Sequence, residues 1–303
     1  MVLLAAILLG LLLGGLPAAA SLQPLRLEIL DGPAQYLVIA PFFFLVGLEL
    51  RRELVDGALS PLRNAVSPAL AAVFGVALPA AWFLLLNRGT VEATGWPIPT
   101  ATDVTFALAV YSAFGSALPR AARTFLLAFA VIDDLIAVIL ITLVFGLSGD
   151  SGFAELLPVV LAFIVPLRWP TKVEFWLLRY LNWIGLPVFA FLMAFIPLPP
   201  VAAVATSAVF WGIAARPIWK WIGVFIGGYL GQRWTSEEAK LNRGNLIAVA
   251  ALGGIGFTVS LLVASIAYAD QPAAYGAAVA ATFIASGVSA VIAAIALVRS
   301  HRS

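Results

Sequence analysis

The chain has 303 residues, of which 63% are hydrophobic and only 11% carry a charge. About a quarter of the residues of a soluble domain are usually charged, so this composition excludes an ordinary soluble protein. The net charge is only +2, although the isoelectric point is near 9.1, and this balance does not indicate nucleic-acid binding. The sequence contains no cysteine, which excludes disulfides and thiolate metal sites within it.

Apolar stretches of roughly 20 residues, the length that crosses a hydrocarbon core of about 30 Å, follow one another along the chain. We predict an all-α polytopic membrane protein with about ten transmembrane helices, at residues 2–20, 34–50, 66–87, 94–118, 123–147, 152–167, 175–195, 199–231, 244–268 and 272–298. The stretch at 199–231 is long enough to be bent. No loop between the stretches is large enough to hold a soluble domain, so residues 1–303 are expected to form a single transmembrane domain.

The first stretch ends in LPAAAS, whose small residues also fit a cleaved signal peptide. It has no basic start and its apolar run is long for a signal, which favours a retained helix. With the N-terminus inside, nearly all Lys and Arg of the connecting loops face the cytoplasm, and only Arg26 and Arg88 fall on the other side. This bias predicts a multi-pass protein with both termini in the cytoplasm.

Few ionisable side chains fall inside the predicted helices, chiefly Asp103, Asp133, Asp134, Arg216 and Lys220. Each costs about 2.5–3.5 kcal/mol to insert, so such residues usually serve a function. A buried ion pair that holds helices together is the alternative for one acid and one base. The adjacent carboxylates of Asp133 and Asp134 leave excess negative charge, which a cation-binding cavity explains better. Protons and a hard cation such as Na⁺ would compete there, and this competition gives exchange if the site opens to each side in turn.

Two predicted helices are interrupted. GWPIPTATDVTFALAV, residues 95–110, breaks at two prolines and restarts at Thr102 and Asp103, which are natural N-cap residues. ALGGIGFTVS carries the second break, made of Gly253, Gly254 and Gly256 and followed by Thr258 and Ser260. Small-residue helix packing is an equal alternative for the glycines alone. In a membrane, a break is tolerated where it is buried in protein or lines a cavity.

Each interruption lies in the middle of three predicted helices, at 66–147 and at 199–298. The first set starts from the cytoplasm and the second from the other side, so the two sets have opposite orientations. Interrupted helices at matching places in two inverted halves are typical of secondary transporters. We therefore expect these sets to form the core, with residues 2–50 and 152–195 as scaffold and dimerisation helices.

Four stretches, PFFFLVGLELRREL, GWPIPTATDVTFALAV, FLLAFAVIDDLIAVIL and GGIGFTVSLLVAS, resemble the signature stretches of the NhaA family of sodium/proton antiporters, in the family's order. The resemblance implies inverted repeats whose two discontinuous helices cross near the midplane of a bacterial inner membrane. It also implies exchange of cytoplasmic Na⁺ or Li⁺ for external protons, without a cofactor and without enzymatic chemistry.

The resemblance assigns roles by position. Asp133 and Asp134 match the cation and proton site, and Thr102 and Asp103 match the crossing, where the acid offsets positive helix ends. The support around the crossing comes from Arg216, Lys220, Gly254, Gly256, Thr258 and Ser260. Glu49 and Glu53 match glutamates tied to pH regulation, and pairing with the neighbouring arginines is an equal alternative for them.

Three departures from the family pattern bear on function. The chain has about two fewer predicted helices than most members, within the expected scaffold. Arg216 stands where members carry lysine, and arginine effectively never loses its proton. We therefore expect Arg216 to be a permanent counter-ion of Asp133 and of the negative ends of the broken helices, while Lys220, one turn on, is an alternative proton carrier. The strand-like LRLEILDG is short for a dimerisation hairpin, so a homodimer is a weaker expectation.

Other classes fit less well. An intramembrane aspartyl protease needs its two aspartates on separate helices and a G-x-G-D setting, which the sequence lacks. A Na⁺-coupled symporter of an organic solute, or a relative that has lost transport, could share the fold. A symporter would accumulate its solute together with Na⁺ and leave vesicle pH unchanged, which distinguishes it from an antiporter.

Overall fold

The computed structural model describes residues 2–16, 62–116, 118–141 and 200–300, together with single residues or short pieces at 21–22, 25, 44, 143–144 and between 176 and 195. The chain divides into two compact units, Met1–Arg51 with Thr142–Pro199 and Arg52–Ile141 with Pro200–Ser303. The described residues of both units form helices and no strand. The predicted all-helical class is confirmed for this part of the chain.

The first unit contributes α1 (Val2–Gly14) and a π-helical turn at Leu181–Gly185. The predicted helices at 34–50 and 152–167 lie outside the described residues, as does the strand-like LRLEILDG. The count of about ten transmembrane helices therefore stays a prediction.

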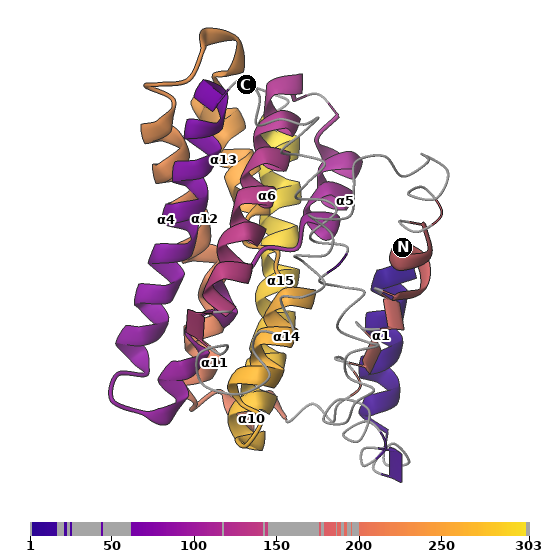
Figure 1. The fold of residues 1–303 in the computed structure, drawn as a ribbon. Helices are drawn as coiled ribbons and strands as arrows, with labels where there is room; N and C mark the ends of the chain where they lie inside the picture. The colour runs from indigo at the N-terminus through magenta and orange to yellow at the C-terminus, as the bar shows by residue number, and fades with distance from the viewer. Residues whose placement is uncertain are drawn as a thin grey trace. The chain divides into compact units, whose positions relative to one another are not determined.

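The second unit holds residues 66–141 and 200–298 of the two predicted core sets, and Figure 1 labels its helices. Its elements are α4 (Leu62–Leu86), η2 (Val91–Gly95), η3 (Ile98–Thr100), α5 (Val104–Phe114), α6 (Arg120–Ile141), α10 (Val201–Val204), α11 (Ala208–Ala214), α12 (Arg216–Gly231), η6 (Glu237–Ala239), α13 (Arg243–Leu252), α14 (Thr258–Ala267) and α15 (Pro272–Ser300).

Both predicted interruptions are present in the second unit. The first separates η3 from α5 at residues 101–103, and the second separates α13 from α14 at residues 253–257. The predicted bend within 199–231 is present too, as an angle of 43° between α11 and α12. In each set, a broken helix thus lies between two others in sequence. The inverted relation of the two sets remains a prediction.

Within the described residues, α4 and α15 are long and apolar enough to cross a membrane, and the bent pair α11–α12 passes the same criterion taken as one. α4 is continuous over its 25 residues although Pro68 and Pro79 lie inside it. Proline is tolerated in membrane helices where neighbouring groups satisfy the freed carbonyls. The apolar helices α13 and α14, of ten residues each, are too short to cross a membrane singly.

A close helix contact in the second unit joins α12 to α4 and depends on glycines spaced four residues apart. A Cβ on Gly223, Gly227 or Gly231 would lie 2.3, 2.1 or 2.4 Å from backbone atoms of α4. The α4 hydroxyl of Ser67 donates to the carbonyl of Gly228 at 2.8 Å. This small-residue packing brings two backbones together, as in other membrane helix pairs. The contact holds α12, and with it Arg216 and Lys220, in a fixed place.

Replacing Gly227 by alanine is therefore expected to lower the free energy of unfolding by roughly 1–3 kcal/mol or more, because the methyl group has no space beside the Leu70 carbonyl. Thermal unfolding of the purified protein in detergent measures the effect. Gly287→Ala on α15 is the matched control, since its Cβ would meet nothing within 4 Å. Equal stability of the two variants would contradict the packing described here.

Candidate functional site

The two chain interruptions lie against each other in the second unit. The backbone N–H of Asp103 donates to the carbonyl of Ile255 at 2.7 Å, and the Thr102 hydroxyl donates to the carbonyl of Gly253 at 3.0 Å. A Cβ on Gly256 would lie 2.2 Å from the carbonyl oxygen of Ala101, so only glycine allows this approach. The predicted crossing of two discontinuous helices is present in this geometry.

Asp103 serves the helix starts on both sides of the crossing. Its side chain is buried, with 5% exposed. One carboxylate oxygen accepts from the Phe106 N–H of α5 at 3.2 Å, and the other accepts from the N–H and hydroxyl of Thr258 at 3.3 and 2.8 Å. A negative charge at two helix N-termini offsets the positive ends of both helix dipoles. The sequence-predicted capping role of Asp103 and the placement of Thr258 agree with this arrangement.

Asp133 on α6 forms an ion pair with Lys220 on α12. The Lys220 ammonium lies 2.8 and 3.1 Å from the two carboxylate oxygens, and both side chains are fully buried. The same ammonium donates to the carbonyl of Thr100, which directly precedes the first interruption. Asp134 occupies the next position of α6 and is partly buried. One carboxylate thus pairs with the lysine beside the crossing, and a second is adjacent to it in the sequence.

Arg216 is fully buried at the start of α12, but it does not contact Asp133. Its guanidinium donates to the hydroxyls of Ser260 and Ser286 at 3.0 and 2.7 Å and to the carbonyl of Thr282 at 3.4 Å. The expectation that Arg216 is the counter-ion of Asp133 is therefore wrong. The reason is its height on α12: one helical turn before Lys220, its neighbours are α14 and α15, whereas Lys220 lies beside Asp133 of α6.

The glycines of the second interruption are needed for close packing. A Cβ on Gly254 would lie 2.6 Å from the Ser289 hydroxyl of α15, and the Gly256 position adjoins both Ala101 and Arg216. The two interpretations of these glycines, small-residue packing and a helix break, therefore both apply, since the glycines allow a neighbouring helix to approach at the break.

Sequence reasoning missed Ser286 and the carbonyl of Thr100. Ser286 lies on a polar line of α15 with Thr282 and Ser289, at spacings of four and three residues. That helical spacing of hydroxyls within an apolar helix was the available signal. Glu49 and Glu53, predicted to take part in pH regulation, lie outside the described residues.

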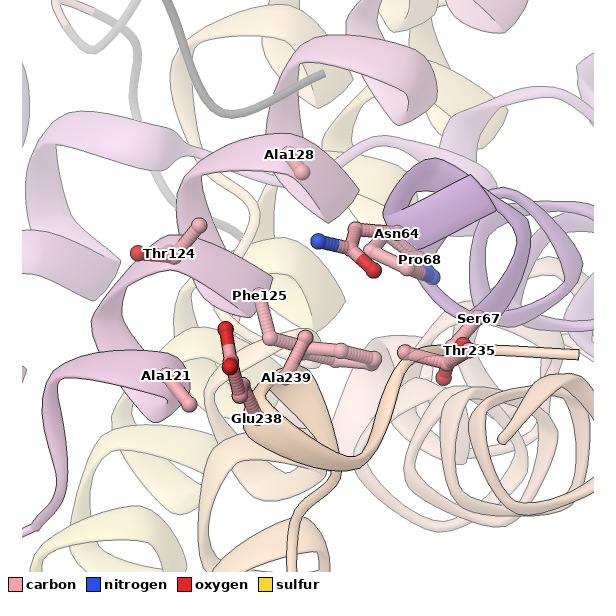
Figure 2. Close-up of a pocket in the computed structure, with 10 residues that line it drawn as sticks. All are labelled: Asn64, Ser67, Pro68, Ala121, Thr124, Phe125, Ala128, Thr235, Glu238 and Ala239. Carbon is pink, nitrogen blue, oxygen red and sulfur yellow. The ribbon is translucent and has the colours of Figure 1, made fainter. Parts of the chain in front are cut away.

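A pocket of about 250 Å³ lies elsewhere, between the first turns of α4 and α6 and the chain around η6 (Figure 2). Asn64, Thr124 and Glu238 are among the polar side chains that line it. None of the predicted site residues that the structure describes borders it. The site at the crossing is instead closely packed, and the part of the chain that is described holds no cluster of three or more His, Cys, Asp or Glu.

A family model described as Na+/H+ antiporter 1 matches residues 18–165 and 150–297 of this chain. The chain belongs to this family. Three relatives that carry the name Na(+)/H(+) antiporter are 32–34% identical to this chain. They are the Na(+)/H(+) antiporter NhaA 2 of Clavibacter michiganensis subsp. michiganensis (34%, 95% of this chain and 83% of the relative), and the proteins named Na(+)/H(+) antiporter NhaA of Tropheryma whipplei strain Twist (32%, 88% and 81%) and Shewanella frigidimarina (33%, 84% and 77%).

Membership of the Na+/H+ antiporter family confirms the resemblance found in the sequence and makes this chain a polytopic membrane protein. The match extends over both interruptions and over α6, so it includes the crossing and the carboxylate pair.

Proposed function

We propose that this chain exchanges Na⁺ or Li⁺ for protons as a secondary antiporter, with Asp133 and Asp134 as the shared binding site. The observation that carries the proposal is the buried ion pair between Asp133 and Lys220 beside the crossed interruptions. An incoming cation can take the place of the Lys220 ammonium at the Asp133 carboxylate, because both are positive charges that bind carboxylate oxygens. Family membership and the printed names of the relatives support the same activity.

The exchange follows from competition for carboxylate oxygens. A hard cation such as Na⁺ prefers oxygen ligands, and two adjacent carboxylates supply them together with nearby carbonyls such as that of Thr100. When the cation binds, the Lys220 ammonium loses its partner and Asp134 loses any proton it holds. When protons return, the ion pair forms again and the cation leaves. Opening of the site to the two sides in turn converts this competition into antiport.

Two protons per cation are accounted for by Asp134 and Lys220. The charge of the Lys220 ammonium already matches the Asp133 carboxylate in the ion pair, so we assign no exchanged proton to Asp133. Lysine, unlike arginine, gives up its proton readily when it is buried without a partner. We therefore assign the second exchanged proton to Lys220, and the permanent charge to Arg216.

The setting of the activity is part of the proposal. Both termini would lie in the cytoplasm of a bacterial cell and the protein would cross the inner membrane many times, as the distribution of Lys and Arg indicates. A homodimer and a pH-regulatory role of Glu49 and Glu53 are proposed from the family resemblance alone.

The test is exchange in proteoliposomes that enclose a pH-sensitive dye. After a pH gradient is imposed, adding Na⁺ or Li⁺ is expected to dissipate it, whereas choline added at the same concentration has no effect. Protein-free liposomes measure the leak. No response to either ion, from mildly acidic to mildly alkaline pH, would contradict antiport. Uptake of an organic solute with Na⁺ at constant internal pH would instead identify a symporter.

A further inference from the structure

Arg216 is a fully buried cation whose bonds lead away from the carboxylate pair. Its Nη1 donates to Ser260 and its Nη2 donates to Ser286, on α14 and α15. Among the residues that the structure describes, none of its hydrogen bonds reaches a carboxylate. A buried charge normally needs an ion partner. The serine hydroxyls must therefore stabilise the guanidinium charge more than an isolated neutral hydrogen bond does.

Each of the two serines also donates a hydrogen bond to a backbone carbonyl in or near an interruption. The Ser260 hydroxyl donates to the carbonyl of Ile98 at 2.9 Å, and the Ser286 hydroxyl donates to the carbonyl of Gly256 at 2.7 Å. A hydroxyl has one hydrogen, so a serine that donates it to a carbonyl turns its lone pairs toward the guanidinium. Arg216 is therefore linked through Ser260 to Ile98 of η3, three residues before the first interruption, and through Ser286 to Gly256 within the second. Backbone carbonyls at helix ends carry partial negative charge.

We propose that Ser260 and Ser286 are positioning residues that hold Arg216 near the two interruptions, so that Lys220 is the one cation among the described residues that pairs with Asp133. The inference rests on the exchange proposed above, because it concerns which cation Na⁺ must displace. In this arrangement the positive charge of Arg216 stays at the crossing throughout the cycle. The positive charge of Lys220 lies at the binding site and is lost when Na⁺ binds.

Removing one hydroxyl should change ion binding as well as packing. Without Ser286, the carbonyl of Gly256 loses its donor and the Nη2 of Arg216 keeps only the longer bond to Thr282. We expect a released Arg216 to move toward the carboxylates near the crossing, where its charge opposes a bound Na⁺.

The test uses three variants on one helix. Ser286→Ala removes the bridging hydroxyl, and Ser286→Thr restores one. Ser289→Ala, three residues on, removes a buried hydroxyl that has no hydrogen-bond partner among the described residues. Two readouts are taken for each variant: the dissociation constant of Na⁺ from Na⁺-dependent thermal stabilisation of the purified protein, and the KM, maximal rate and pH profile of exchange in proteoliposomes.

Ser286→Ala is expected to weaken Na⁺ binding and raise KM about tenfold, as for the loss of a hydrogen bond to a charged group. Its pH profile should shift, and Ser286→Thr should restore wild-type behaviour, while Ser289→Ala matches wild type throughout. A Ser286→Ala variant that only unfolds at lower temperature and exchanges more slowly, with KM and pH profile unchanged, contradicts the inference. So does one that is indistinguishable from Ser289→Ala. A wild-type protein without exchange contradicts the proposed function itself, and is recognised before any variant is compared.

Discussion

Replacing Asp134 by asparagine is expected to abolish exchange of Na⁺ or Li⁺ for protons, with a loss of at least about a hundredfold in rate. Asparagine keeps the size of the side chain but can neither release a proton nor supply a negative charge to a cation. The protein should still fold, because Asp134 is only partly buried and the Asp133–Lys220 ion pair is untouched. The measurement is dye-monitored exchange in proteoliposomes, with thermal unfolding as the check on folding.

Asp133→Asn should cripple exchange as well and should also lower stability, because it leaves the Lys220 ammonium buried without its ion partner. The two substitutions thus differ in a measurable way, although their carboxylates are adjacent in sequence. Asp270→Asn is the control for the loss of one acidic charge, since Asp270 is exposed in the turn between α14 and α15. Wild-type exchange rates in both Asp133→Asn and Asp134→Asn would place the site elsewhere.

The sequence could predict the crossing because its causes are local. Clustered prolines and glycines interrupt the helices here, whereas the isolated Pro68 and Pro79 leave α4 continuous. Asp103 caps the helix that restarts, as its bond to Phe106 shows. That the two interruptions meet was an inference from paired breaks in two halves. Only the structure supplies the bonds that join them, from Asp103 to Ile255 and from Thr102 to Gly253.

The choice between Arg216 and Lys220 could not be predicted from the sequence. The two residues are four positions apart on one helix and so lie on the same face. Which of them meets Asp133 depends on the height of α12 relative to α6, about 6 Å per four residues, and this height is set by tertiary packing. The glycines that fit α12 closely against α4 contribute to it.

Ser286 was missed for a different reason. A single serine in an apolar membrane helix is common, and its usual interpretation is small-residue packing. Its function depends on two partners from other helices, the guanidinium of Arg216 and the carbonyl of Gly256, which are 70 and 30 residues away. The helical spacing of hydroxyls on α15 marks Ser286 as a polar position, but it does not indicate which groups of other helices Ser286 contacts.

Lys220 gives the second large effect, and two substitutions there separate its charge from its proton. Lys220→Ala leaves Asp133 buried and unpaired, which is expected to cost about 3–5 kcal/mol of stability and all exchange. Lys220→Arg keeps a positive charge beside Asp133, so most of the stability should remain. Arginine does not release its proton, so only Asp134 is left to exchange one.

The charge moved per cycle therefore distinguishes the two possible proton carriers. With two protons per Na⁺, the wild-type protein should generate a membrane potential in proteoliposomes, which a potential-sensitive dye detects. Lys220→Arg should exchange electroneutrally or not at all, because one proton then balances one cation. Arg216→Lys is the control, since Arg216 is held by Ser260 and Ser286 rather than by Asp133, and it should stay electrogenic. If Lys220→Arg is electrogenic at the wild-type level, both protons travel on the carboxylates, and Lys220 is a fixed counter-ion of Asp133 rather than a carrier.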